Sequence, residues 1–560
     1  MRYSKRYVIL TAILLVTFLA KLNTWNDEYA DVTAFRGAQL QDEVFYPLKA
    51  RSINEEGLVQ LTVGEETYGV KDGVMLGDHM QVMASLPFVQ DFFGCSASLY
   101  ENQKISLDYG DTNYTFYINS MDAKRGEKAI ALDVMPELHE GQAYLSLQDL
   151  CREFGCEYSY DEINYQATIT GDVRKGVLPK SYDLRQKERV SAVRNQKNTS
   201  TCWAQAALSA LESTLLPEEK TAFDTNRMIE HNAYQVDSSL GGNYMMAVSY
   251  LVSWMGPDKD GTKTVDKHVQ EVHFYNSDDI DEIKWAVYQH GGVSTSIYAN
   301  VSTSNLSKSS YYNKKKNAYC YKETEKPNHD VVIIGWDDQY SASNFTGKVP
   351  GNGAFICQNS WGATFGENGV FYVSYYDTNI GEQAVSYVRA ESTDNYDTIY
   401  QSDLCGWVGQ VGYNKEKIHA ANIYEAQADE QIESAGFYAL GKNTTYQLYV
   451  VTDYRNTASL ASRVEVARGT LADAGYYTIP FDHAYSVKEG EKFAIVVVLS
   501  TPGMNHPMAI EYAKDALTKH VTISDGEGYI SNNGLDWESV EDTAKGNLCL
   551  KAYGKKVEQP

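Results

Sequence analysis

The sequence lacks the cysteine spacings that hold metals or stabilise a very small fold. Its eight cysteines include no Cys-x-x-Cys pair, and none combines with histidines at a metal-binding spacing. A structural zinc site is therefore not expected. Eight cysteines in 560 residues are also too few for a disulfide scaffold, and any pairing among them stays open.

Positive charge is scarce as well. The 49 Lys and Arg residues face 74 Asp and Glu residues, which gives a net charge of -25, and no local basic stripe offsets it. Nucleic acid is therefore excluded as an expected partner.

No long segment has a disordered composition, because 43% of residues are apolar and 22% are charged. Since single cores stop growing near roughly 250 to 300 residues, we expect three folded units.

Long apolar runs are missing except at the N-terminus. There, residues 7–20 are apolar, follow the basic segment MRYSKR and are followed at once by Lys21. This layout is typical of an export signal. The run is shorter than the roughly 20 residues of a membrane span, yet no clean small-x-small cleavage site follows it. Residues 1–27 are therefore predicted to be a signal peptide or an N-terminal membrane anchor.

Residues 28–172 contain an internal repeat. The segment LPFVQDFFGCSASLYENQKISL, which begins at Leu86, matches LSLQDLCREFGCEYSYDEINYQATI, which begins at Leu145. Each copy predicts an amphipathic helix that ends at Gly94 or Gly155 and continues into a strand. A duplicated α+β domain is the simplest explanation. No nucleophile, acid and base gather here, so we expect a spacer or binding module.

Two regions of different composition follow. Residues 178–390 begin LPKSYDLRQKERVSAVRNQ and mix helical with strand patterns. From 395 to 556, short β-rich runs such as TTYQLYVVTDY, GYYTIPF and KFAIVVVLS alternate with Gly, Asn and Asp turns. This second pattern predicts an all-β sandwich.

Cys202 is the candidate nucleophile. Ser200 or Thr201 can cap a helix that starts beside it, and apolar residues recur behind it at helical spacing: Trp203, Ala206, Ala207, Leu208 and Leu211. A thiol at a helix N-terminus faces unpaired N–H groups and the helix macrodipole, which favour the thiolate that attacks carbonyl carbon.

The thiolate needs a base and an oxyanion site. His329 precedes the apolar run VVII, which predicts a buried strand that would fix the imidazole. Asn359 follows another strand, where its amide oxygen could orient the ring, and Trp361 could shield that hydrogen bond. Gln196 lies six positions before Cys202, so its amide could join the Cys202 backbone N–H in an oxyanion hole.

These residues make the central region resemble the papain-like cysteine peptidases. The resemblance rests on Leu178-Pro179, the segment from Gln196 to Trp203, the pair Gly241-Gly242, the strand after His329, and Asn359-Ser360-Trp361-Gly362. The Cys–His and Cys–Asn separations are near the roughly 130 to 150 residues of that family. The resemblance implies a helical lobe packed on a β-barrel lobe, a thioester mechanism and no metal or organic cofactor.

The resemblance also implies a substrate-binding set. Gly241 and Gly242 would pair with the substrate backbone, and Asn243, Tyr244, Asp330 and Trp361 would line the cleft. Two positions depart from the family. Thr199 replaces a cysteine that usually forms a disulfide, so we expect packing to hold this loop instead. Asp330 replaces a small apolar residue and predicts a preference for polar or basic side chains in the second substrate pocket.

The flanking regions resemble other modules of bacterial surface proteins. Residues 28–172 are similar to the repeat named after the N-terminal domain of copper amine oxidases, which implies no copper here. Residues 395–556 resemble a lectin-like sandwich, with cell-wall or carbohydrate contact as the implied role. No segment before Leu178 resembles the helical inhibitory propeptide of the peptidase family.

The sequence thus predicts an exported or cell-surface cysteine endopeptidase that acts on proteins or peptides. A glycan on the sequon at Asn198 would block Cys202, which favours a bacterial surface over a eukaryotic secretory pathway. Two alternatives stay open: an adhesin or cell-wall binding protein with a silent peptidase fold, and a transpeptidase that transfers the acyl group to an amine.

Overall fold

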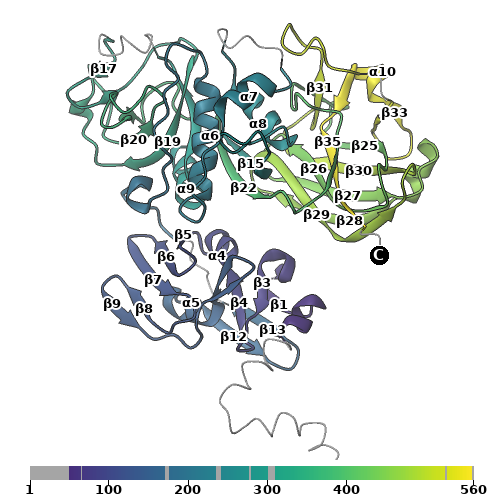
Figure 1. Cartoon of the computed structure of the whole chain (residues 1–560), viewed down its shortest axis with the longest axis horizontal. Coiled ribbons are helices and arrows are strands. Elements are labelled where there is room, and N and C mark those ends of the chain that lie inside the picture. Colours follow the sequence, from purple (N-terminus) through teal and green to yellow (C-terminus); the bar gives the residue numbers. More distant parts are fainter. Residues whose placement is uncertain are drawn as a thin grey trace, which may run out of the picture. The chain divides into compact units, whose positions relative to one another are not determined.

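The computed structural model describes residues 50–64, 66–170, 176–234, 241–276, 279–299, 309–523 and 526–557. The chain forms two compact units, Met1–Val177 and Leu178–Pro560. The predicted signal or anchor at 1–27 lies outside the described residues. Figure 1 gives the positions of the labelled elements.

The N-terminal unit is built on the repeat. Helices α4 (Leu86–Phe93) and α5 (Leu147–Phe154) start at Ser85 and Ser146, whose hydroxyls accept backbone N–H groups. Both helices end at glycines in the left-handed conformation, Gly94 and Gly155. The two helix ends expected from the sequence are therefore confirmed, and equivalent caps show that the two copies share one local structure.

Three small sheets complete this unit. Strands β4 and β11, which precede the two helices, pair with each other in antiparallel register. The strands are β1 (Gln60–Val63), β2 (Glu66–Tyr68), β3 (Val74–Leu76), β4 (Val82–Ser85), β5 (Ser96–Tyr100), β6 (Lys104–Tyr109), β7 (Thr112–Tyr117), β8 (Ala123–Arg125), β9 (Lys128–Ile130), β10 (Glu137–His139), β11 (Gln142–Ser146), β12 (Glu157–Asp161) and β13 (Gln166–Thr170).

The second unit begins with a helical part and a β part. Its long helix α6 (Cys202–Leu215) is almost entirely buried and packs against strands β19 and β22. The other helices are α7 (Thr225–His231), α8 (Tyr244–Val252) and α9 (Ile280–His290). The strands are β14 (Ser181–Asp183), β15 (Lys267–Tyr275), β16 (Val293–Ile297), β17 (Tyr312–Asn313), β18 (Ala318–Tyr319), β19 (His329–Asp337), β20 (Ala354–Gln358), β21 (Val370–Ser374) and β22 (Ala384–Ser392).

The C-terminal part is the expected sandwich. Its core lies between a sheet that contains β26, β29 and β35 and a six-stranded sheet ordered β28-β27-β30-β25-β32-β33. The elements are β23 (Thr398–Tyr400), β24 (Gly409–Val411), β25 (Lys417–Glu425), β26 (Glu430–Ala439), β27 (Thr444–Val451), β28 (Val464–Leu471), β29 (Ala474–Val487), β30 (Lys492–Ser500), β31 (Met508–Tyr512), β32 (Gly528–Ser531), β33 (Glu538–Ser539), α10 (Val540–Ala544), β34 (Gly546–Leu548) and β35 (Leu550–Lys556).

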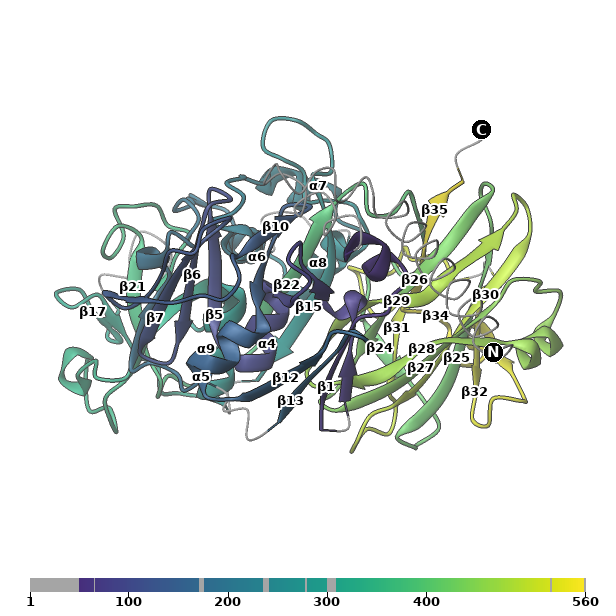
Figure 2. The same ribbon diagram turned by 90° about the horizontal axis from the view of Figure 1, so that it is seen from below.

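One continuous sheet joins the two parts of the second unit. Strand β15 pairs with β29 in antiparallel register, and Figure 2 shows the two strands side by side. Tyr438 and Tyr476 of the sandwich belong to the same buried apolar cluster as the residues of α6 and α8. Residues 178–560 therefore form one compact unit. The length of the chain had suggested three folded units in all, two of them in this region.

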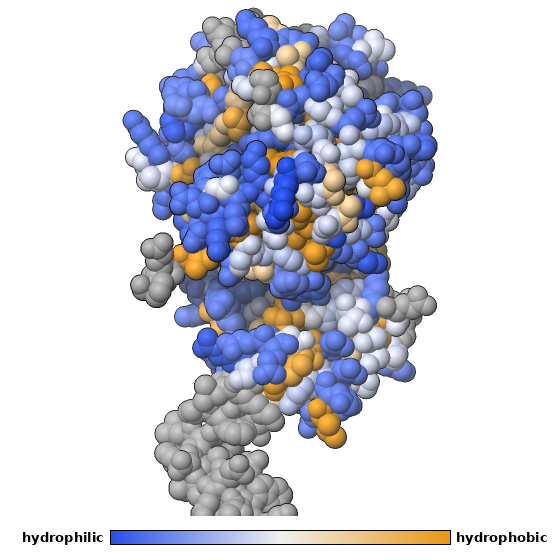
Figure 3. Space-filling model, turned by 90° about the vertical axis from the view of Figure 1, so that its right-hand side faces the viewer, coloured by the Kyte–Doolittle hydropathy of each residue, from blue (hydrophilic) through white to orange (hydrophobic). Residues whose placement is uncertain are grey.

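The surface of this unit offers little apolar area on the face drawn in Figure 3, where hydrophobic patches are small and separate. No helix within the described ranges is long and apolar enough to cross a membrane.

The β15–β29 junction generates a stability prediction. A Cβ at Gly475 would overlap the backbone carbonyl oxygen of Val272 on the paired strand, so Gly475→Ala should push the two strands apart. We expect a loss of about 1 to 3 kcal/mol in the free energy of unfolding, measured by urea denaturation. In the control Gly69→Ala, the nearest atom lies 3.4 Å from the new Cβ, so the change should be near zero. Equal stability of the two variants would contradict the prediction.

Candidate active site

Cys202 is the first residue of α6, as the sequence predicted. The capping is different from the expectation: Thr201 occupies the cap position, but its hydroxyl does not cap the helix. Instead it lies 2.8 Å from the hydroxyl of Thr199. Thr199 also donates to the backbone oxygen of Gln196 at 2.6 Å. Hydrogen bonds of the threonine side chains, rather than packing alone, therefore hold the loop that has no disulfide.

The base is oriented by an amide. His329 begins β19, and its Nε2 lies 2.9 Å from Oδ1 of Asn359, which directly follows β20. Asn359 Oδ1 also accepts the backbone N–H of Ser360 at 2.8 Å. The ring of Trp361 stacks on the imidazole with centroids 4.6 Å apart. This arrangement fixes the ring and leaves Nδ1 of His329 for Cys202.

Gln196 is tied to the same segment. Its backbone N–H donates to the Ser360 carbonyl at 2.8 Å, and its Oε1 accepts the Ser360 hydroxyl at 2.7 Å. Its Nε2 donates one hydrogen to the Thr199 carbonyl at 2.7 Å. Because an amide nitrogen carries two hydrogens, the second can serve an oxyanion near Cys202.

Burial dominates the titration of the reacting pair. It raises the pKa of Cys202 to about 12, and the negative charge of Asp330 adds to this effect. Backbone N–H groups of Asp330 and of the first residues of α6, Trp203 and Cys202, act in the opposite direction but do not outweigh burial. Burial also lowers the pKa of His329 to about 4. Burial thus disfavours both charged forms, the thiolate and the imidazolium, and His329 is the group available to remove the thiol proton during attack.

These groups open onto a cleft of about 860 Å³. Gly241, Gly242 and Asn243 line it together with Cys202, His329 and Trp361, among other residues. A Cβ at Gly242 would come within 2.6 Å of the Trp203 indole nitrogen, so only glycine fits there.

Two of the expected substrate-binding residues have other contacts. Asn243 caps α8 by accepting the backbone N–H of Met246 at 3.2 Å, although it also lines the cleft. Tyr244 is not among the residues that line the cleft. Its ring packs on Phe274 with centroids 6.0 Å apart.

Asp330 lies in the cleft with two polar residues that the sequence did not reveal, Ser296 and Gln383. The Ser296 hydroxyl donates to Asp330 Oδ1 at 2.6 Å and lies 3.4 Å from Gln383 Oε1. Ser296 is brought there by the register of β16 on β19, in which it faces Asp330 directly. Burial raises the pKa of Asp330 to about 6.

Among the described residues, one group of side chains is close enough to share a cation: Asp78, Glu137 and His139 of the N-terminal unit. Glu137 accepts the Asp78 backbone N–H at 3.0 Å and lies 2.7 Å from His139 Nε2. These groups therefore already bond to one another, and none of them belongs to the cleft.

Sequence comparison identifies three domains in order. Residues 60–169 match the copper amine oxidase N-terminal domain, residues 178–389 the papain family of cysteine proteases, and residues 399–554 the lectin-like domain. Residues 178–389 are therefore a papain-family cysteine protease domain, and the expected order of domains and fold class are confirmed.

Relatives agree with this assignment. A cysteine protease of Blomia tropicalis is 24% identical over 37% of this chain and 64% of its own length. Cysteine proteinase 1 of Entamoeba histolytica is 29% identical over 34% of this chain and 62% of its own length. The chain thus spans somewhat less than two thirds of these curated relatives.

Solved structures extend the likeness to the C-terminal part. The clostridial cysteine protease Cwp84 after propeptide cleavage has a TM-score of 0.60 and 25% identity, and the match covers 67% of this chain and 99% of that one. The cysteine protease and lectin-like domains of Cwp84, a surface-layer-associated protein of Clostridium difficile, share the fold with a TM-score of 0.59 and 24% identity, over 68% of this chain and 89% of that one.

The charge of Asp330 generates a prediction about the thiol. Because Asp330 raises the pKa of Cys202, Asp330→Asn should lower it and increase the thiolate fraction. We expect iodoacetamide to alkylate Cys202 roughly 3- to 10-fold faster at pH 8 in this variant. The rate is read by mass spectrometry of the peptide that carries Cys202. The control Asp337→Asn, on the same strand β19, should leave the rate unchanged, and an unchanged rate in Asp330→Asn would contradict the prediction.

Proposed function

We propose that this chain is an exported cysteine endopeptidase that hydrolyses peptide bonds through a thioester on Cys202. The observation that carries the proposal is the His329–Asn359 hydrogen bond at 2.9 Å, capped by Trp361, in a cleft that also contains Cys202. An imidazole oriented by an amide acceptor, in the same cleft as a thiol, is the arrangement that cysteine–histidine nucleophilic catalysis requires.

The proposed mechanism uses the chain's own groups. His329 takes the proton from Cys202 as sulfur attacks the carbonyl carbon, and Gln196 with the Cys202 backbone N–H binds the oxyanion. His329 then protonates the leaving amine. In the second half, His329 removes a proton from water, which hydrolyses the thioester and releases Cys202.

The similarity to Cwp84, described as surface-layer-associated, and the basic-apolar N-terminus support a location at a bacterial cell surface. We propose the boundaries 28–172, 178–390 and 395–556 for the three domains. Carbohydrate or cell-wall contact is proposed for the last of these, on its likeness to lectin-like domains.

Hydrolysis of a fluorogenic peptide library under reducing conditions tests the proposal. Cleavage should be abolished by Cys202→Ala and by an epoxide inhibitor of thiols, whereas Cys357→Ala, which alters a buried cysteine on β20, should retain it. Turnover that survives Cys202→Ala would refute the assignment. Adding an amine nucleophile to the reaction tests the transpeptidase alternative. A transpeptidase would transfer the acyl group to the amine, so amide products would replace the hydrolysis products.

Asp330 generates a prediction about substrate and pH. We propose that its carboxylate, with Ser296 and Gln383, receives a basic side chain in the second substrate pocket. Because the pKa of Asp330 is raised to about 6, the carboxylate is charged above that pH and neutral below it. The preference for Lys or Arg over an uncharged residue, expressed as a ratio of kcat/KM, should be about tenfold at pH 7.5 and lost at pH 5.

Asp330→Asn should make that ratio low and independent of pH, while Cys202 still cleaves substrates with a neutral residue in this position. A wild-type ratio that does not change between pH 5 and 7.5 would contradict the role of Asp330.

A further inference from the structure

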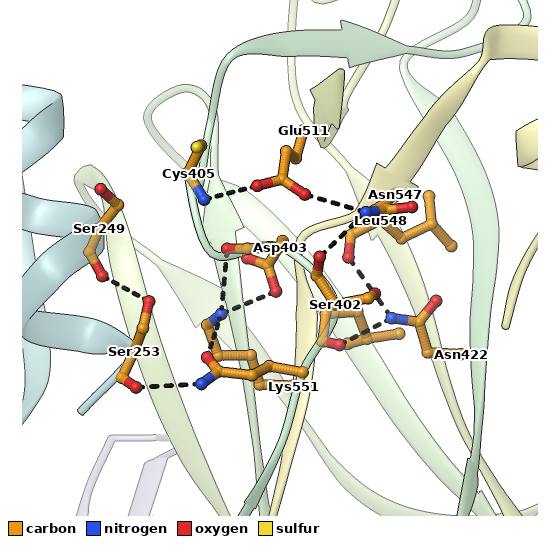
Figure 4. A network of polar contacts seen from close by, with 12 residues as sticks. Ser249, Ser253, Ser402, Asp403, Cys405, Asn422, Glu511, Asn547, Leu548 and Lys551 are labelled. Carbon is orange, nitrogen blue, oxygen red and sulfur yellow. Dashed lines mark hydrogen bonds and ion pairs between the residues drawn. The ribbon is translucent and has the colours of Figure 1, made fainter. Parts of the chain in front are cut away.

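A lysine and an aspartate are buried together where the sandwich meets the helical part of its unit. Lys551 lies on β35, and Asp403 lies between β23 and β24. Lys551 Nζ is 2.7 Å from Asp403 Oδ1, and both side chains are 0% exposed. Figure 4 shows the two groups pointing at each other. Lysine is almost never fully buried, so this pair needs a specific explanation.

The polar partners around the pair satisfy the ammonium but leave one oxygen of the carboxylate unpaired. The lysine nitrogen has three acceptors: Asp403 Oδ1, Gln401 Oε1 at 2.8 Å and the Asp403 backbone carbonyl at 3.5 Å. Asp403 Oδ2 has no hydrogen-bond partner among the described residues. A buried ammonium and carboxylate are expected to satisfy all their donors and acceptors, because losing water costs several kcal/mol for each ion. An amide has one N–H and one oxygen, which fits this environment better.

We propose that Lys551 and Asp403 form an intramolecular isopeptide bond. A proton first passes from Nζ to the Asp403 carboxylate across their hydrogen bond, which gives a neutral amine and a neutral acid. The amine then attacks Cγ. The Nζ–Cγ bond forms, one Nζ–H bond and the bond from Cγ to its hydroxyl break, and one water molecule leaves. Nothing is oxidised or reduced, and the product N–H donates to Gln401.

Glu511 on β31 is a further buried acid whose pKa is influenced by the charge of the pair. Its carboxylate is 2% exposed and accepts the Cys405 backbone N–H at 2.5 Å and the Asn547 amide at 2.9 Å. Burial raises the pKa of Glu511, and the charge of Asp403 adds to this effect. Burial likewise raises the pKa of Asp403. A raised pKa eases proton transfer to Asp403 and makes Glu511 the acid that we assign to protonate the departing hydroxyl.

The bond would secure the junction between the two parts of the unit. The segment that carries Asp403 also contacts the helical part: Gln401 Nε2 donates to the Ser253 carbonyl at 3.0 Å, and the Tyr234 hydroxyl donates to the Cys405 carbonyl at 2.6 Å. A covalent link from this segment to β35 would keep the sandwich attached even after a cut in an intervening loop. The proposal does not depend on peptidase activity.

Peptide mapping of the full chain tests the bond, with Cys202→Ala used to prevent self-cleavage. Trypsin should release a branched peptide that joins residues 390–415 to residues 546–555, uncut at Lys551 and lighter by one water, about 18 Da, than the two peptides together. Two linear peptides, one of them ending at Lys551, would overturn the proposal. Because the wild-type pair is measured directly, the result does not depend on whether a variant folds.

An internal control and two variants sharpen the result. Lys284 and Asp338 form an ion pair at the same 2.7 Å but with 37% of the aspartate exposed, so their peptides should be linear. Lys551→Arg and Glu511→Gln should both give linear peptides. A branched peptide that persists in Glu511→Gln would remove Glu511 from the reaction, and branching at Lys284 would show that the link is an artefact of preparation.

Discussion

The hydrogen bond between His329 and Asn359 is the contact on which the rest of the site depends. One oxygen of Asn359 accepts hydrogen bonds from the imidazole and from the Ser360 backbone N–H. Ser360 in turn bonds to Gln196 twice: its carbonyl accepts the Gln196 backbone N–H, and its hydroxyl donates to Gln196 Oε1. The base and the oxyanion donor are thus positioned by three consecutive residues, 359–361. Their geometry is coupled, since a shift of this segment would misplace both groups at once.

Features that depend on short stretches of chain could be predicted from the sequence. Cys202 starts a helix and His329 starts a strand because their neighbours carry the right periodicity, and Gly94 and Gly155 end helices because both adopt the left-handed conformation. Ser296 could not be found in this way. It reaches Asp330 only through the register between β16 and β19, which no local pattern specifies.

The sheet shared by the two parts of the second unit could not be predicted either, because strand pairing between distant segments has no local sequence pattern. Nothing in the sequence of strand β15 or β29 indicates a partner some 200 residues away in the chain. The one local feature related to this pairing is Gly475. Because it has no side chain, the backbone of Val272 can approach closely. The change in composition near residue 395 marks two regions that match different families. In the structure, however, residues of both regions belong to one buried apolar cluster.

Asp330 connects substrate choice to the reactivity of the thiol. Its negative charge raises the pKa of Cys202 and so opposes the thiolate in the empty cleft. On the proposed role, a cationic side chain that enters the pocket pairs with Asp330 and cancels much of that field at the sulfur. The thiol would then lose its proton to His329 more readily when the preferred substrate is bound than when the cleft holds only water. On this proposal, a single carboxylate would both favour attack on basic substrates and suppress reaction of the resting thiol.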